Sequence, residues 1–207
     1  MSYKLMGAAA LTGTAGATGL VVANKEKIFG KSRTLAGELK EKGYKMVSSV
    51  DDGTKRKTIL DAKVSAYKAV GNSSQEFKGK SKDAMNSDVL LKTCQELEKS
   101  TDYESLSSIF KKWCSLDFKD VLVTVGGRSV ISDTPSDGTN WKNSLTSHRE
   151  KMKTVITGVT ESSSDSNNGQ WNKVKEWCEG KLGTQYSNDS KVDFDRVEEW
   201  CLAAKAQ

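Results

Sequence analysis

The chain has 207 residues, of which 36% are hydrophobic and 29% charged, a composition typical of a soluble globular body with one domain or two small ones. The formal net charge of +5 is uneven, with +4 in residues 1–34, +3 in residues 35–116 and −2 in residues 117–207. Five arginines and a basic excess near the N-terminus do not make the basic stripe of a nucleic-acid-binding body, so that class is disfavoured.

The segment from Leu5 to Ala23 contains no charged residue and is followed by four basic residues. Its nineteen residues are long enough to cross a bilayer as a helix, and its regularly spaced small residues would let that helix pack closely against another. A signal peptide is the alternative, because Ala15-Gly16-Ala17 has the small-x-small form that a signal peptidase recognises. We therefore expect residues 1–34 to be a membrane anchor or signal segment with a basic flank.

The orientation of such an anchor is left open by the charges around it. More Lys and Arg residues follow the segment 5–23 than precede it. The positive-inside rule would then keep the body in the cytoplasm. A body displayed outside the cell requires the opposite orientation.

A glycine-rich stretch from Thr12 to Gly19 has the form of the phosphate-binding turn of extended short-chain dehydrogenases. The carboxylate that would bind the ribose, Asp51, comes thirty-two residues after Gly19, which is too far for the second strand of that fold. None of the five tyrosines belongs to a Tyr-x-x-x-Lys pair, which such enzymes use for proton transfer. A nucleotide site is therefore disfavoured, and no cofactor is expected.

The single proline and the scarcity of alternating β-branched runs predict a mainly α fold for the rest of the chain. Within it a motif recurs, in which apolar residues three positions apart are followed by a cysteine. It reads Trp171-x-x-Val174-x-x-Trp177-Cys178, then Phe194-x-x-Val197-x-x-Trp200-Cys201, with weaker copies before Trp113-Cys114 and at Leu90-x-x-Thr93-Cys94. This spacing places the apolar residues on one helix face. We expect these tryptophans to be buried anchors near helix ends: Trp113, Trp171, Trp177 and Trp200.

All four cysteines follow these motifs and fall into two pairs, Cys94 with Cys114 and Cys178 with Cys201. The leading interpretation is a small buried residue packed beside a tryptophan, and a disulfide within each pair is the main alternative. Zinc binding is disfavoured because no CxxC spacing occurs. A reactive thiol is disfavoured as well, because the dipole at a helix C-terminus opposes a thiolate.

The chain also aligns with itself at an offset near 84. Gly43 falls on Gly127 and Cys94 on Cys178, while Cys114 falls on Cys201 at an offset of 87. Further matches join Met46-Val47-Ser48 to Val130-Ile131-Ser132, Asp52-Gly53-Thr54 to Asp137-Gly138-Thr139, and Leu60 to Leu145. Several matches in one order predict two tandem helical units related by internal duplication, residues 35–116 and 117–207.

Each unit is expected to begin with a short helix, at 35–42 and 117–124. A glycine, a brief extended piece and an Asp-Gly-Thr turn that caps a long helix should follow, with the long helices at 55–70 and 140–156. The β-branched run 121–125 has the composition of a strand, but its alignment with the first unit favours a helix. The apolar stripe of the first long helix is expected at Ile59, Ala62, Ala66 and Ala69.

The small-residue N-terminal segment, the stretch Gly43-Tyr44-Lys45-Met46-Val47-Ser48-Ser49 and the Trp-Cys motifs together resemble the large paralogous sets of uncharacterised proteins of haemotropic mycoplasmas. The resemblance covers nearly the whole chain. It implies a membrane-anchored protein that is displayed to the host and varied among copies, and it carries over no catalytic or ligand-binding residue. Two departures are Thr93, where the motif has Trp, and Arg56, where the second unit has Trp141.

Catalytic patterns are not found in the sequence. His148 is the only histidine, so a Ser/His/Asp or Cys/His site would need it, and its charged helix predicts a solvated side chain. No P-loop, HExxH or EF-hand pattern occurs. We therefore expect no catalytic, cofactor-binding or metal-binding residues. The expected function is that of a non-enzymatic, membrane-anchored surface or antigen-like protein, and the alternative is a small intracellular enzyme or thiol-redox protein.

Overall fold

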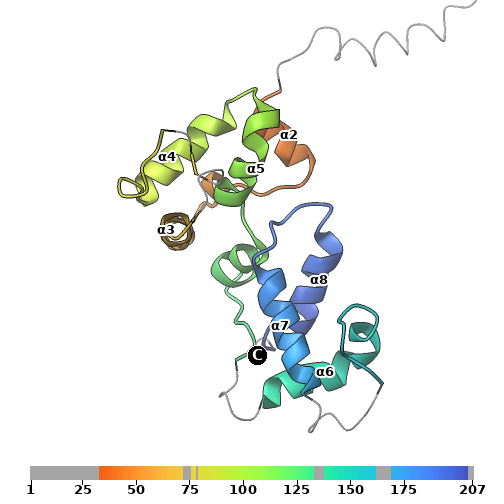
Figure 1. The fold of residues 1–207 in the computed structure, drawn as a ribbon. Helices are drawn as coiled ribbons and strands as arrows, with labels where there is room; N and C mark the ends of the chain where they lie inside the picture. The colour runs from red at the N-terminus through yellow and green to blue at the C-terminus, as the bar shows by residue number, and fades with distance from the viewer. Residues whose placement is uncertain (1–32, 72–75, 78, 133–137, 162–168, 205–207) are drawn as a thin grey trace, which may run out of the picture. The chain divides into compact units, whose positions relative to one another are not determined.

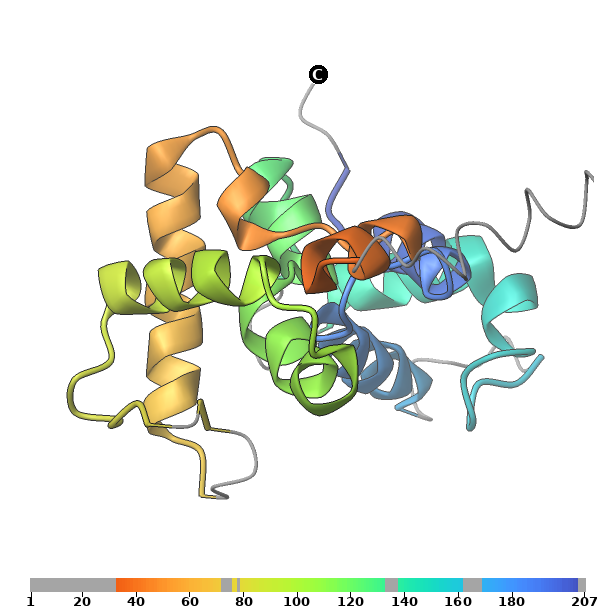
Figure 2. The same ribbon diagram turned by 90° about the horizontal axis from the view of Figure 1, so that it is seen from above.

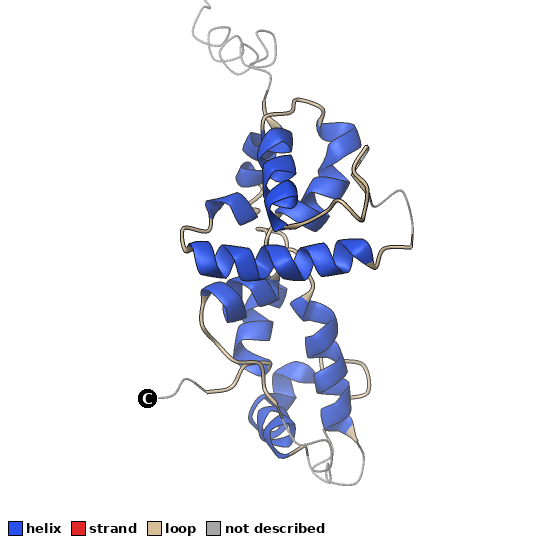
Figure 3. Ribbon diagram, turned by 90° about the vertical axis from the view of Figure 1, so that its left-hand side faces the viewer, coloured by secondary structure: helices blue, strands red, loops and turns tan. Residues whose placement is uncertain are grey.

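The computed structural model describes residues 33–71, 76–77, 79–132, 138–161 and 169–204. Throughout these residues the regular secondary structure is helical, with isolated β-bridges in place of strands, so the predicted mainly α class is confirmed (Figures 1 and 3). None of the described helices is long and apolar enough to cross a membrane. The segment 5–23, on which the anchor prediction rests, lies outside the described residues.

Four helices between Thr34 and Cys114 begin at a side chain that caps them. Each capping oxygen accepts a hydrogen bond from a backbone N–H of the first turn, which would otherwise have no partner inside the helix. The helices and their caps are α2 (Leu35–Glu41) with Thr34, α3 (Gly53–Lys68) with Asp52, α4 (Ser87–Glu98) with Asn86, and α5 (Tyr103–Cys114) with Asp102. The Asp-Gly-Thr turn at residues 52–54 therefore caps α3, as the sequence predicts.

These helices and the short 3₁₀ turn η1 (Val47–Ser49) enclose one hydrophobic core. Figure 2 shows α4 crossing α3 steeply near one end of α4, with α2 and α5 beside its other end. The large buried side chains of this core include Trp113, Tyr67, Phe110, Met46 and Leu35.

The buried face of α3 differs from the predicted stripe. Ile59 is buried as expected, but Ala62, Ala66 and Ala69 are exposed. Larger side chains on a neighbouring face of the helix are buried instead, namely Leu60, Lys63, Val64 and Tyr67. A large side chain removes more apolar area from water than an alanine methyl, so burial follows size here.

A second core is built from η3 (Asp120–Val125), α6 (Thr139–Met152), α7 (Gln170–Leu182) and α8 (Lys191–Trp200). The run 121–125 is helical, as the alignment predicted, with the wider hydrogen-bonding pattern of a π-helix. The first core draws on residues from Leu35 to Leu116 and the second on residues from Phe118 to Leu202. Val121 packs against both cores, so they meet at η3.

Two glycines with positive φ offer a matched test of the contact between the two cores. Gly43 has φ +79°, and a Cβ built there would lie 2.8 Å from the backbone nitrogen of Asn188, which donates to the Lys42 carbonyl. Gly127 has φ +67°, and a Cβ there would meet no described atom within 4 Å.

We expect Gly127→Ala to lower the free energy of unfolding by about 1–2 kcal/mol, the cost of a left-handed conformation for a residue with a Cβ. Gly43→Ala should lower it by a further ~1–3 kcal/mol, because backbone atoms of the loop around Asn188 must also shift. Chemical denaturation of both variants checks this difference. Equal losses would show that the loop does not pack against Gly43 in solution.

Candidate functional site

The most distinctive chemistry of the body is two disulfides, each joining a pair of neighbouring helices. Cys94 of α4 bonds Cys114 at the end of α5, and Cys178 of α7 bonds Cys201 just after α8. The Cα atoms are 5.4 Å and 5.7 Å apart, inside the range of about 4.4–6.8 Å that the bond requires. These are the two pairs that the sequence offered as the alternative to free packing residues.

The bonded sulfurs limit what the cysteines can do. All four residues have no exposed surface, and no free cysteine is present. Disulfide sulfurs offer no thiolate, so neither a zinc ligand nor a nucleophile is available from them. Among the described residues, no group of three or more His, Cys, Asp or Glu side chains could hold a metal ion.

The four predicted tryptophan anchors divide into two kinds. Trp113 and Trp200 are buried, with 2% and 1% of their surface exposed, next to the cysteines that end α5 and follow α8. Trp171 and Trp177 are only partly buried and pack against the second core from its edge. Trp177 lies beside Trp200, with ring centroids 5.3 Å apart.

A pocket of about 520 Å³ contains the single histidine and is formed mainly by α6 and the end of α8. The His148 side chain is 26% exposed, and thus half-buried where the sequence predicted a solvated residue. Its Nδ1 atom lies 3.5 Å from Glu199, which also pairs with the Lys151 ammonium at 2.6 Å and accepts a hydrogen bond from the Trp200 indole N–H at 3.0 Å. The hydrogen bond from Lys151 lowers the pKa of the Glu199 carboxyl, so this acid is ionised at neutral pH.

Ser144, one turn before the histidine on the same helix, is not aligned with it. Its hydroxyl donates a proton to the Trp200 carbonyl at 2.6 Å. A Ser/His/acid triad needs the hydroxyl to donate to the imidazole instead. Ser144 is therefore not placed to act as a nucleophile activated by His148.

A second polar cluster, at the meeting of the two cores, was not foreseen from the sequence. The Lys63 ammonium, on α3, lies 3.1 Å from Asp120 and 3.9 Å from Asp117. The two aspartates also cap each other: Asp120 N–H donates to the Asp117 carboxylate at 2.8 Å, and Asp117 N–H donates to the Asp120 carboxylate at 3.2 Å. The Lys63 and Asp120 side chains are only 9% and 10% exposed, so this ion cluster is largely removed from water.

This junction cluster, defined as Lys63, Asp117 and Asp120, borders a pocket of about 430 Å³ whose other charged lining residues are Lys112 and Lys119. Burial raises the pKa of the Asp117 carboxyl above its ordinary value, Lys63 acts against this, and the charge of Asp120 adds to it. Two carboxylates share one buried ammonium, which explains why the second carboxylate holds a proton more readily.

The raised pKa of Asp117 predicts how stability changes with pH. A folded-state pKa above the unfolded one adds stability that is complete below pH 3.8 and is lost as pH rises through the raised folded value. Asp117→Asn keeps an oxygen that can accept from the Asp120 N–H but removes the titrating charge. We expect this variant to be at least as stable as the parent at pH 7 and to lose less stability between acid and neutral pH, as measured by denaturation across that range. A steeper loss in the variant would contradict the assignment.

The sequence did contain one signal for this cluster. Lys63 occupies a position between Leu60 and Val64 on the buried face of α3, where a charged residue needs a partner. The partner could not be identified, because Asp117 and Asp120 are more than fifty positions away along the chain.

Comparison with protein-family models, with curated proteins and with solved structures gives no match for this chain.

Proposed function

We propose that the chain is a non-enzymatic surface protein, anchored to a membrane through its N-terminal segment 1–34, with its helical body outside the cytoplasm. The two disulfides carry this proposal. Disulfides persist in oxidising surroundings and are rare in the cytosol, where thiol-reducing systems keep cysteines free. A body in which every cysteine is bonded suits the outside of the cell.

The disulfides argue against the orientation that the basic flank suggests. The positive-inside rule is a bias in how segments insert, and it is counted over the short stretches beside a span. Two buried disulfides are instead a property of the whole folded body. We give them the greater weight, so Lys25, Lys27, Lys31 and Arg33 are assigned to the outer side of the anchor, or to the mature end if the segment is removed.

The thiol-redox alternative is disfavoured by access. Thiol–disulfide exchange requires a thiolate to reach a disulfide sulfur. All four bonded cysteines have no exposed surface, and helices cover both bonds. The bonds therefore suit a structural role that stabilises each pair of helices.

We also propose that the two cores descend from one duplicated unit, which corresponds to the predicted division into residues 35–116 and 117–207. Matching backbone contacts support this. Met46 bridges Ser115 and Val130 bridges Leu202, and the adjacent hydrogen bonds run from Leu116 N to Lys45 O at 2.8 Å and from Ala203 N to Ser129 O at 2.9 Å. In the first unit the Leu35 N–H donates to the Ser100 carbonyl, and in the second unit the Phe118 N–H donates to the Thr184 carbonyl.

The bridge contacts use the offsets of the sequence alignment, 84 for the brief extended piece and 87 for the end of the unit, and the last pair of contacts uses offsets of 83 and 84. The duplication accounts for why each core carries its own disulfide. Within this proposal the chain is a membrane-anchored protein of the kind that the resemblance to the haemotropic mycoplasma families implies. An experimental structure in which the two units take unlike folds would refute the duplication.

Protease treatment of intact cells tests the location. Trypsin added outside should remove the body and leave a cytoplasmic marker protein intact, whereas lysed cells should lose both. A body that stays intact in whole cells, but is cut after lysis, would overturn the proposal.

A further inference from the structure

The two disulfide-bonded helix pairs differ at the edge of their cores, among residues that are buried or partly buried. Positions can be compared by counting from the bonded cysteines, which makes the comparison independent of where the protein is located. The residue just before the first cysteine is Thr93 in α4 and Trp177 in α7. Around Trp177 the second pair carries an ion network, with Asp193 2.5 Å from Lys181 and 3.0 Å from Arg196.

The first pair carries apolar residues at the same three positions. Leu97 stands where α7 has Lys181, three residues after the cysteine. Leu106 and Ile109 stand where α8 has Asp193 and Arg196, eight and five residues before the second cysteine. A tryptophan and three charged residues are thus replaced by a threonine and three apolar side chains, on a side where the sister unit is polar.

The result is an apolar pocket of about 610 Å³ between α4 and α5. Thr93 is buried, and its hydroxyl donates to the Val89 carbonyl at 2.8 Å, so this hydroxyl already has a partner, and the serines Ser105 and Ser108 also line the pocket. Leu97, Leu106 and Ile109 are only partly buried and line the walls. Exposed apolar surface gathered in a concave site is the usual form of a ligand pocket.

A fixed aromatic ring completes the wall. Phe77 is 5% exposed and lines the pocket, and it stacks on Tyr67 with ring centroids 5.6 Å apart. Its backbone N–H donates to the Tyr67 hydroxyl at 3.0 Å, which holds this segment in place. An aromatic wall favours an aromatic guest through stacked or edge-to-face contact.

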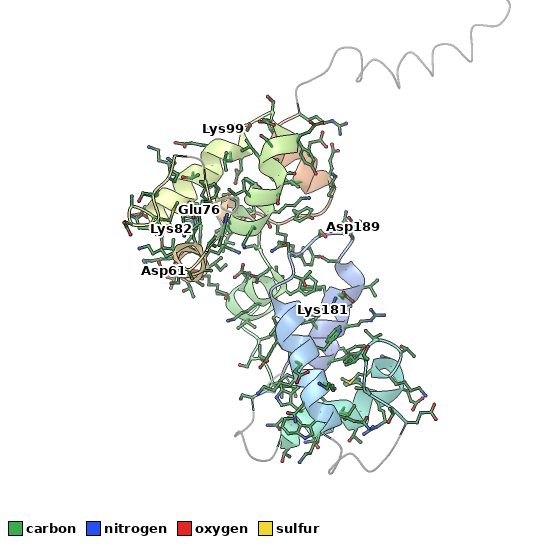
Figure 4. The ribbon with its side chains drawn as sticks, viewed as in Figure 1. Asp61, Glu76, Lys82, Lys99, Lys181 and Asp189 are labelled. Carbon is green, nitrogen blue, oxygen red and sulfur yellow. A yellow bond between two sulfur atoms is a disulfide. The ribbon has the colours of Figure 1, made fainter. Side chains whose placement is uncertain are left out.

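The charges at the rim indicate an uncharged guest. Glu76 pairs with Lys82 at 3.0 Å (Figure 4), and the remaining rim charges, Glu96 and Lys80, are of opposite sign. The rim therefore selects neither cations nor anions. In Figure 4 Lys181 marks the corresponding side of α7, where the chain supplies its own tryptophan.

We infer that the α4–α5 pocket binds a neutral small molecule with an aromatic ring of indole size. In the second unit the chain places its own indole, Trp177, at the equivalent position, between the bonded helices and against Trp200. In the first unit Thr93 leaves that volume open, and about 610 Å³ falls within the ~300–1,000 Å³ of small-molecule sites.

The test uses the purified, oxidised full chain with methyl-labelled Leu, Val and Ile, titrated with indole and followed by NMR. Saturable shifts are expected for the methyls of Leu97, Leu106 and Ile109, with none for Val174 or Leu182 of the second unit. Thr93→Trp should abolish the shifts, because the new side chain fills the pocket. Thr93→Val, which keeps the size of the side chain, should retain them.

A second variant guards against a fold that does not accept the tryptophan. Leu106→Asp combined with Ile109→Arg copies the residues of the second unit at partly buried positions and should also abolish binding. Shifts that fail to saturate, or that persist in both Thr93→Trp and the double variant, would overturn the inference. Because the measurement is made on purified protein, its outcome is independent of the cell-surface proposal.

Discussion

Lys63→Met is expected to lower the free energy of unfolding at neutral pH by about 3–5 kcal/mol, because it leaves the buried Asp120 carboxylate and the partly buried Asp117 carboxylate without this cation. The Lys63 and Asp120 side chains are each about nine-tenths buried, and the lysine is the nearest cation to both aspartates of the junction cluster at 3.1 Å and 3.9 Å. Methionine fills a similar volume, so the loss reports the charge and not a cavity. Urea denaturation at pH 7 measures the change.

Lys57→Met is the matched control on the same helix. Lys57 pairs with Asp61 at 2.8 Å, but the two side chains are 69% and 52% exposed. An exposed pair of this kind contributes little to stability, because water screens it and both side chains lose freedom. Similar losses in the two variants would show that the junction cluster is solvated and does not join the cores.

The same variant should respond to acid. Once Asp117 is protonated, its carboxyl carries no charge for the Lys63 ammonium to balance. The difference in free energy of unfolding between Lys63→Met and the parent chain is therefore expected to shrink as pH falls through the raised pKa of Asp117. A difference that stays constant down to acid pH would mean that lost packing, and not lost charge, causes the destabilisation.

Replacing both cysteines of one disulfide by alanine is expected to lower stability by roughly 3 kcal/mol in the chain-entropy model. The bonds close loops with sequence separations of 20 and 23 residues, so Cys94→Ala with Cys114→Ala and Cys178→Ala with Cys201→Ala should have similar effects. Removing both bonds should approach the whole stability of a typical domain, about 5–15 kcal/mol, and leave the body largely unfolded at 37 °C.

Treatment with a reductant distinguishes a disulfide from a pair of cysteines that are only packed side by side. If the cysteines were only buried side chains, adding a reductant to the parent chain would leave its stability unchanged. With the disulfides in place, reduction under denaturing conditions followed by refolding in reductant should reproduce the loss seen in the alanine variants. Reduction of the native protein should be slow, since none of the four cysteines is exposed.

Much of the fold follows from local sequence signals. Asp52 caps α3 because its carboxylate can accept hydrogen bonds from first-turn N–H groups. The burial of Trp113 and Trp200 could be predicted because their motifs place apolar residues at helical spacing. The run 121–125 shows the value of the internal alignment, since its β-branched composition alone indicates a strand. The disulfide pairs could be named from spacing, but whether the sulfurs bond depends on how the helices meet.

What could not be predicted depends on contacts between distant parts of the chain. The stripe of α3 was misassigned because three alanines and a set of larger residues both repeat at helical spacing, and only the surrounding core decides between them. Lys63 finds its carboxylates across the junction, and the apolar pocket at Thr93 needs two helices and the Phe77 segment together. Thr93 was visible in the sequence as a departure from the motif, although its consequence was not.

Mass spectrometry of unreduced peptides, from protein released from the surface of intact cells, tests whether each unit carries its own disulfide. Two linked peptides are expected, Cys94 with Cys114 and Cys178 with Cys201, and no free thiol. Four free thiols would remove both the disulfide-bonded helix pairs and the argument for an oxidising location. A linkage between Cys94 and Cys178, or between Cys114 and Cys201, would contradict the division into two units that each carry their own bond.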